Sequence, residues 1–352
     1  MNSQKREIPT IVILAAIVIV LGGVIYSSEI VTQFLMALFI AVIASKPVGY
    51  LEKKGVPGAV AVGIVIVVIV AVTSSLGGLI GTSVARFSSN LDAYDTKVTS
   101  GLQSVFALAH DFGFNISTEG LLSAISPGTV MNFTAGLLNG LGSLMGNMAM
   151  ILLIVAFMLG ETSSYGVKLK AIVVNPDVSM VGITTAMNQI NQYLGIKTLT
   201  SLATGLIVGI LLWAIKVDFP FMWGLIAFLM NYIPNIGSIL AAIPAMLMAF
   251  INLGGAGVLW TAGIYLAVNM IVGNIVEPKI MGKGLGISTL VVMLSLIFWG
   301  WILGTIGMFL SIPLTLAAKI AFESQESTRW IAVLLGTEED AKNILRERGE
   351  EV

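Results

Sequence analysis

Residues Asn231 to Pro244 read NYIPNIGSILAAIP and place two prolines, a glycine and several polar side chains inside a long apolar run. Proline has no amide hydrogen and clashes with the carbonyl one turn earlier, so it ends or kinks a helix. Unpaired backbone groups are costly in hydrocarbon, so a break is tolerated there only where protein buries it or where it lines a wet cavity. If the surrounding chain is a membrane protein, the stretch is either a structural kink or a functional interruption.

Composition places the chain in the membrane class. Of its 352 residues, 57% are hydrophobic and 11% are charged, and the mean hydropathy is +0.97, far from the balance of a soluble domain. Two of its apolar runs are too long for one span. Runs able to cross a hydrocarbon core of ~30 Å lie near 8–26, 30–45, 58–82, 142–160, 198–215, 220–252, 255–276 and 286–320.

The same composition argues against other classes of protein. A net charge of −1 gives no footprint for nucleic acid, and the absence of cysteine excludes disulfides, thiolate metal sites and a cysteine nucleophile. The single histidine, His110, has no companions at metal-ligand spacing. GKGLG at 282–286 lacks the spacing of a phosphate loop. We therefore expect no enzyme activity, no cofactor and no metal.

Lysine and arginine positions predict the topology. With both termini in the cytoplasm, 15 of the 18 basic residues lie inside and 3 outside, as the positive-inside rule favours. The outside residues are Arg86, Lys97 and Lys216. The inside residues are Lys5, Arg6, Lys46, Lys53, Lys54, Lys168, Lys170, Lys197, Lys279, Lys283, Lys319, Arg329, Lys342, Arg346 and Arg348.

This count makes hairpins of the two long runs. The run 220–252 must begin and end outside, whereas 286–320 begins and ends inside around Gly300, Gly304 and Gly307. Two hairpins of opposite entry resemble the discontinuous helices at transporter substrate sites. The expected fold is all-α: a polytopic integral membrane protein with about six full spans, two broken or re-entrant helical hairpins and an amphipathic helical extracytoplasmic segment.

Five regions follow along the chain. They are membrane helices (1–82), the extracytoplasmic amphipathic segment (83–146), a membrane helix and a cytoplasmic helix (147–197), a transport core with both hairpins (198–320) and a cytoplasmic tail (321–352). In the second region Val84, Phe87, Leu91, Tyr94 and Val98 recur at helical spacing. Their stripe either covers the protein's own surface or forms an oligomer contact.

The break carries the first group of candidate site residues. Pro234 is expected to end a helix that starts near Phe221, and the following residues to provide turn and N-cap chemistry for a half-helix that reaches Phe250. Amide and hydroxyl side chains suit a small, uncharged, polyhydroxylated solute better than an ion. The candidates for solute binding or gating are Asn231, Tyr232, Pro234, Asn235, Gly237, Ser238, Asn269 and Asn274.

A second group surrounds Glu277, the only acid near the helical core of the C-terminal region. An acid near membrane depth is a functional candidate, here for ion or proton coupling. Alternatively, Glu277 pairs with Lys279 or Lys283 and anchors the turn at Pro278. On the cytoplasmic side, Gln189, Gln192 and Tyr193 indicate either a polar vestibule or a plain interfacial helix.

Three motifs resemble the autoinducer-2 exporter family. They are FPFMWGLIAFLMNYIPNIGSILAAIPA (219–245), NIVEPKIMGKGLGISTLVVMLSLIFWGWILGTIGMFLSIPLT (274–315) and FLMALFIAVIASKPV (34–48), within a likeness that covers about 8–335. The resemblance implies a prokaryotic inner-membrane protein in the lipid bilayer, a homo-oligomer with a pentamer expected, that moves small solutes without ATP-binding machinery. The implied solute is autoinducer-2, carried out of the cell.

Alternatives remain beside this reading. Other branches of the family are associated with sodium (or lithium)/proton antiport, which would depend on Glu277, and a non-transporting membrane scaffold is a third hypothesis. For transport, we expect the two hairpins and the helix between them to expose the polar break alternately to each side of the membrane.

Overall fold

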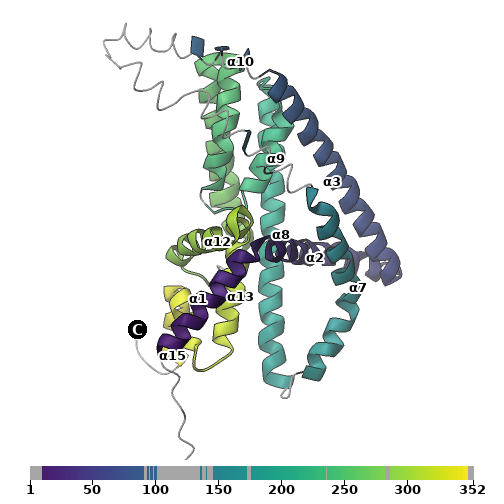
Figure 1. The fold of residues 1–352 in the computed structure, drawn as a ribbon, viewed down its shortest axis with the longest axis vertical. Helices are drawn as coiled ribbons and strands as arrows, with labels where there is room; N and C mark the ends of the chain where they lie inside the picture. Colours follow the sequence, from purple (N-terminus) through teal and green to yellow (C-terminus); the bar gives the residue numbers. More distant parts are fainter. Residues whose placement is uncertain are drawn as a thin grey trace, which may run out of the picture.

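The computed structural model describes residues 10–90, 93–94, 96–97, 99–100, 135–136, 140, 146–172, 176–234, 236–281 and 286–347. Regular structure within these ranges is entirely helical (Figure 1). The helices are α1 (Thr10–Tyr26), α2 (Ser28–Lys53), α3 (Gly58–Ser89), α7 (Met148–Ile172), α8 (Pro176–Ala214), α9 (Pro220–Met230), α10 (Gly237–Val268), η1 (Asn269–Val276), α11 (Glu277–Met281), α12 (Thr289–Phe309), α13 (Ser311–Glu323), α14 (Arg329–Leu335) and α15 (Glu338–Glu347).

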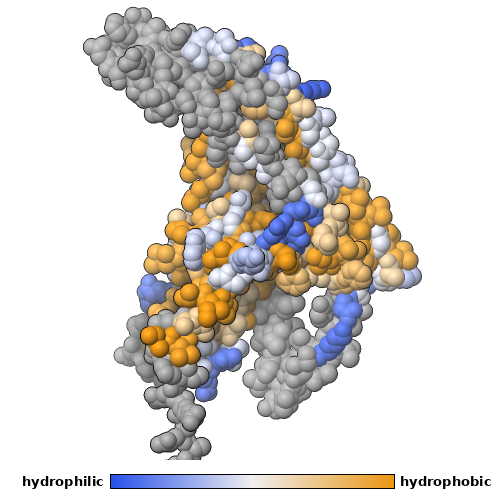
Figure 2. All heavy atoms as spheres, viewed as in Figure 1, coloured by the Kyte–Doolittle hydropathy of each residue, from blue (hydrophilic) through white to orange (hydrophobic). Residues whose placement is uncertain are grey.

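The membrane assignment follows from the length and apolarity of these helices. Five described segments suffice to cross a bilayer: Ser28–Lys53, Gly58–Phe87, Asn188–Ala214, Gly237–Met281 and Thr289–Phe309. Two shorter apolar helices, Met148–Glu161 and Pro220–Met230, accompany them. Figure 2 shows apolar residues over much of the described surface at mid-height of this face. The prediction of an all-α polytopic membrane protein is confirmed.

The first hairpin begins where α8 turns back into α9. Lys216 and Phe219 in the turn have φ values of 65° and 56°, and α9 then packs closely along α8. Glycines permit this approach, since a Cβ on Gly224 of α9 would lie 2.5 Å from the Gly205 carbonyl of α8. Close backbone contact through small residues is the usual way to join helices in a membrane.

The break then reverses the chain a second time. Helix α9 ends at Met230, one turn before Pro234, as expected from the clash of a proline ring with the carbonyl four residues earlier. The turn is tight, because a Cβ on Gly237 would lie 1.8 Å from the Met230 carbonyl oxygen. The first arm of α10 packs against α9, so the interruption is the tip of a hairpin.

Two glycines turn the remaining long runs. Gly254 (φ 68°, ψ −157°) divides α10, and Gly304 (φ 65°, ψ −149°) divides α12. Both lie in a backbone region that is essentially restricted to glycine. The long runs 220–252 and 286–320 each contain a reversal, as the charge count predicts, the first at the break around Pro234 and the second at Gly304 among the expected glycines. Gly254 lies between the runs 220–252 and 255–276.

One feature of the first hairpin differs from expectation. The N-cap position of α10 is Ile236, without a side-chain capping bond, so neither Gly237 nor Ser238 caps the half-helix as predicted. Gly237 is instead its first residue. The cap that does form belongs to the second hairpin, where the Ser288 hydroxyl accepts a hydrogen bond from the Val291 amide at 3.3 Å.

Three apolar cores position the site, and the third contains the site residues Tyr193 and Tyr232. The largest joins α8, α9 and α10 around Trp223 and Met248. Phe87 and Tyr94 belong to it, with ring centroids 5.7 Å apart, so this part of the predicted amphipathic stripe covers the protein's own surface. Leu91 and Val98 of the stripe, and residues 101–134 of that segment, lie outside the described residues. The second core joins α2, α3 and α7.

Candidate functional site

Helix α8 carries a buried polar face opposite the hairpin tip. Lys197, Thr200, Ser201 and Thr204 are spaced by three and four residues, which puts them on one side of a helix. Their exposed fractions are 7%, 2%, 0% and 7%. Buried polar groups in a membrane protein are costly unless they are paired, so the partners of these side chains identify the site.

Two of those partners come from the hairpin tip. The Asn231 amide donates to the Ser201 hydroxyl at 2.9 Å, and the Tyr232 hydroxyl donates to that of Thr198 at 2.8 Å. The Tyr232 ring also packs 4.3 Å from Phe309, centroid to centroid, in the second hairpin. The tip is therefore held onto α8 by side-chain hydrogen bonds and by aromatic contact with the other hairpin.

The third partner is Glu277 at the start of α11. Its two carboxylate oxygens lie 2.8 and 3.0 Å from the Lys197 ammonium nitrogen, and the Thr200 hydroxyl donates to it at 3.2 Å. The side chains of this ion pair are 9% and 14% exposed. Removing one partner of a buried ion pair strongly destabilises the folded protein, because the other charge then stays buried without a partner.

This pairing corrects the expected anchor of Glu277. The predicted partner Lys279 is exposed, and Lys283 lies outside the described residues. The ion pair instead joins residues 80 positions apart and ties α11 to α8. We call Lys197, Thr198, Thr200 and Ser201 together with Asn231, Tyr232 and Glu277 the polar seam.

A π-helix leads into the seam. Residues Asn269–Val276 form η1 between α10 and α11, and π-helical turns in α-helices frequently occur at functional sites. Asn269 is half-buried, and its Oδ1 would lie 3.0 Å from a Cβ on Gly273, so the glycine leaves room for the amide. Asn274 points elsewhere, since it is exposed. Sequence patterns did not predict the π-helix.

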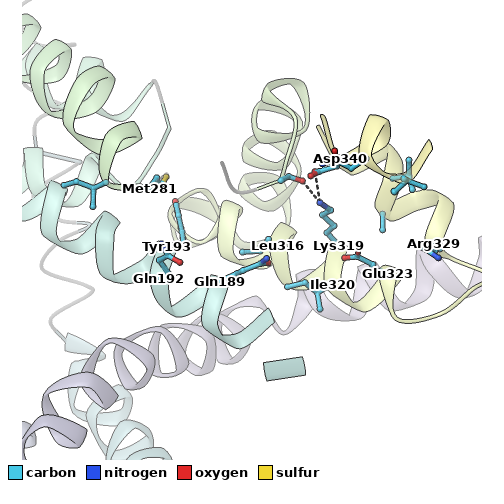
Figure 3. Close-up of a pocket in the computed structure, with 16 residues that line it drawn as sticks. Gln189, Gln192, Tyr193, Met281, Leu316, Lys319, Ile320, Glu323, Arg329 and Asp340 are labelled. Carbon is cyan, nitrogen blue, oxygen red and sulfur yellow. Dashed lines mark hydrogen bonds and ion pairs between the residues drawn. The ribbon is translucent and has the colours of Figure 1, made fainter. Parts of the chain in front are cut away.

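Beside the seam lies a polar vestibule, a pocket of about 700 Å³. The predicted vestibule residues Gln189, Gln192 and Tyr193 line it from α8, and Figure 3 shows them in a row facing α13. Charged side chains complete the wall. They are Lys319 and Glu323 of α13, Arg329 of α14 and Asp340 of α15.

The C-terminal helices close one side of this vestibule. Lys319 donates to the Gly286 carbonyl and to Asp340 at 3.3 Å, as Figure 3 shows. Thr337 and Asp340 bond each other's backbone amides at 3.1 and 3.2 Å, which caps α15. Partial burial opposes ionisation of Asp340, but the Thr337 amide and the Lys319 charge outweigh it and hold the pKa of Asp340 below its ordinary value.

The candidate residues from the sequence therefore separate into three groups. Asn231, Tyr232 and Glu277 are brought together, and the three vestibule residues lie next to them along α8. Pro234 lies in the turn of the break, and Gly237 and Ser238 are the first two residues of α10, whereas Asn274 and Lys279 are exposed. Asn235 lies outside the described residues.

The α8 half of the seam was not predicted from the sequence. Lys197 contributed only to the charge count, and Thr198, Thr200 and Ser201 fall in the apolar run 198–215, which was predicted only as a membrane span. The signal was present, because a lysine followed by hydroxyl residues at three, four and seven positions makes a polar stripe on one helix face. The stripe does not stand out in the apolar run, because threonine and serine are common in membrane helices that have no functional site.

The arrangement has the properties of a solute pathway. A polar vestibule adjoins a buried line of hydroxyl, amide and charged groups within an apolar, multi-pass helical protein. Discontinuous helices whose tips meet such groups characterise secondary transporters. The fold and the site thus define a membrane transporter.

Comparison with known proteins identifies which transporters. A model of the AI-2E family transporter matches residues 14–326, and the chain belongs to this family. The AI-2 transport protein TqsA of Escherichia coli K12 is 40% identical over 92% of this chain and 94% of its own length. A putative transport protein of Haemophilus influenzae is also 40% identical, over 95% of this chain and 97% of its own. The putative transport protein YhhT of Escherichia coli K12 is 36% identical, over 92% and 93%.

Proposed function

We propose that this protein exports autoinducer-2 from the cytoplasm, through a path that leads from the vestibule to the polar seam. The observation that carries the proposal is the continuity of one helix face. Gln189, Gln192 and Tyr193 line the vestibule, and Lys197 and Ser201 follow on the next turns of α8. A solute leaving the vestibule along α8 meets the hairpin tip first.

The chemistry of the seam supports a neutral polyhydroxylated solute. Asn231, Tyr232, Thr198 and Ser201 offer hydroxyl and amide groups, which hydrogen-bond to sugar-like hydroxyls in either direction. In this conformation they bond each other. Solute hydroxyls that replace these partners would release the tip from α8 without leaving buried groups unpaired, which keeps the cost of opening low.

The printed name of TqsA supports the choice of autoinducer-2, because that relative shares two fifths of its residues with this chain over nearly the full length. The same proposal places the protein in the inner membrane with both termini and the vestibule in the cytoplasm, as the lysine and arginine count favours. It also includes assembly into a homo-oligomer.

Cation/proton antiport is the second candidate, and the state of Glu277 bears on it. A proton carrier must exchange its proton with an accessible path, but Glu277 is engaged by Lys197 and Thr200. The ion pair therefore favours a role for Glu277 in holding α11 against α8 over a role as a proton carrier. Antiport would require the pair to separate in every cycle.

Flux of labelled autoinducer-2 in proteoliposomes tests the proposal. We expect the wild-type protein to accelerate autoinducer-2 movement over protein-free vesicles, and Asn231→Leu to abolish the acceleration while the protein remains folded in detergent. Thr305→Leu, an exposed change near the second turn, is the matched control. Equal fluxes with and without protein would contradict the proposal.

The antiport candidate needs a separate variant, because Glu277→Gln leaves Lys197 buried and unpaired. The double change Lys197→Met with Glu277→Leu removes both charges together and avoids that cost. Sodium-dependent proton flux that is present in the wild type and absent from the folded double variant would favour antiport over export of a neutral solute.

A further inference from the structure

A second cavity lies where α2 packs against α8, and Thr198 of the polar seam is one of its lining residues. It is a groove of about 250 Å³, and the two helices that form it are in contact (Figure 1). Its lining is mostly apolar, with three polar side chains, Lys46, Asn191 and Thr198. The lining residues are Val42, Ile43, Lys46, Asn191, Gly195, Thr198, Leu199 and Leu202.

The apolar part of the groove is open to the outside of the chain. Leu199 and Leu202 are 59% and 47% exposed, in a segment that is apolar enough to span a membrane. In a transporter embedded in lipid, exposed side chains of this kind face hydrocarbon. An acyl chain is therefore the material that naturally fills the space between them.

The polar part has the character of a phosphate site. Lys46 is exposed and has no carboxylate partner among the residues that the structure describes. Its ammonium lies over Gly195, where a Cβ would be only 2.6 Å from the nitrogen. The glycine thus allows the lysine to lie across the groove, and Asn191 adds an amide to the same rim.

We propose that this groove binds an anionic phospholipid, with its phosphate at Lys46 and Asn191 and an acyl chain along Leu199 and Leu202. Basic pockets between membrane helices recognise anionic headgroups through this combination of charge and apolar wall. Lys53, the last residue of α2, and Lys54, which follows it, add to the positive field two turns beyond Lys46. Lys54 lies 4.8 Å from the Tyr50 ring centroid. The proposal does not depend on which solute is transported.

The groove also connects the lipid to the transport machinery. Thr198 lines the groove and accepts the hydrogen bond from Tyr232 of the hairpin tip. A lipid in the groove packs against the same turn of α8 that holds the tip. Occupancy by lipid is therefore expected to alter the hold on the tip, in addition to strengthening the contact of α2 with α8.

Native mass spectrometry of the full chain with added phosphatidylglycerol or phosphatidylcholine tests the site. We expect preferential retention of phosphatidylglycerol, and a loss of about fivefold in its affinity with Lys46→Gln, the effect of one basic side chain near an anionic headgroup. Lys46→Arg should retain binding. Gly195→Ala, which changes no charge, should weaken it by displacing the lysine.

Lys53→Gln is the matched control, because it removes one charge from the same helix outside the groove. Equal losses in Lys46→Gln and Lys53→Gln would show diffuse attraction and overturn the proposal, as would equal retention of the two lipids. Displacement of the lipid by excess glycerol phosphate would show that phosphate alone binds.

A changed oligomer distribution in Lys46→Gln without a change in bound lipid would assign the groove to a second copy of the chain. Either result would also overturn it.

Discussion

Among single residues, we expect substitutions in the ion pair of Lys197 and Glu277 to have the largest effect on stability. Both side chains are largely buried, so a single truncation leaves an uncompensated charge. We expect Lys197→Met to destabilise the protein by about 3–5 kcal/mol, and the double variant with Glu277→Leu to recover most of that loss. Thermal melting in detergent measures both. Additive losses in the double variant would mean that the two charges do not interact.

The bond between Asn231 and Ser201 is a smaller and separate contact. Both residues are at most 8% exposed, and hydrogen bonds between membrane helices contribute about 0.6 kcal/mol on average, with a maximum near 1.7. A double-mutant cycle with Asn231→Ala and Ser201→Ala is expected to give a coupling energy in that range. A coupling energy of zero would indicate that the tip is held by packing alone.

The contacts that attach α15 to α13 depend on pH, because they include the carboxylate of Asp340. Its pKa is lowered in the folded protein, so its contribution to stability is present above the ordinary pKa of 3.8 and is lost as the pH falls through the lower, folded value. In the wild type we expect proteolysis of the C-terminal helices to increase as the pH falls below 3.8 and through the lower pKa of the folded protein. In Asp340→Asn, cleavage should already be raised at neutral pH. Identical digestion of both proteins at neutral pH would contradict this role.

Among the helical elements, two reversals of the chain depend on glycine, one at Gly254 within α10 and one at Gly304 in the second hairpin. A Cβ at Gly254 or Gly304 meets no other atom within 4 Å, so the only cost of alanine is the backbone conformation. That cost is about 1–3 kcal/mol for a residue forced into this region.

Gly263→Ala provides the comparison, since Gly263 also has open space around it but lies within the second arm of α10 with no positive φ. We expect Gly254→Ala and Gly304→Ala to lower the melting temperature and Gly263→Ala to leave it unchanged or raise it, because alanine favours helix. The same decrease in all three variants would show that the turns are not the reason for the glycines.

Hairpins could be predicted from the sequence because charge and length leave few alternatives. A run that is too long for one span, with lysines placed on one side, has to turn back, and Gly304 and Pro234 mark where. The π-helix could not be predicted in this way. Within it the Asn269 side chain lies against Gly273, a local contact that leaves no periodic pattern along the chain.

At the scale of the whole molecule, the site combines one half that was visible in the sequence with one that was not. Asn231 and Tyr232 stand out because they interrupt an apolar run. Their partners Ser201 and Thr198 lie 30 and 34 positions earlier, and Lys197 lies 80 positions from Glu277. Pairings over such distances come from the antiparallel return of the chain, so a local reading assigned Glu277 to a neighbouring lysine instead.

In the proposed export mechanism the hairpin tip moves. Two side-chain hydrogen bonds hold it on α8 in the present conformation, and the proposed export requires it to leave them so that solute can pass from the vestibule. Because the chain contains no cysteine, a pair of thiols can be introduced at the tip and on α8 without interference from others.

The most direct test is export of labelled autoinducer-2 from vesicles that contain the Ser201→Cys and Asn231→Cys double variant, with and without mercuric ions that bridge the two thiols. We predict that bridging stops export, that excess free thiol restores it, and that neither single-cysteine variant responds. Export by the bridged protein at the unbridged rate would contradict the account, because the solute would then pass without release of the tip.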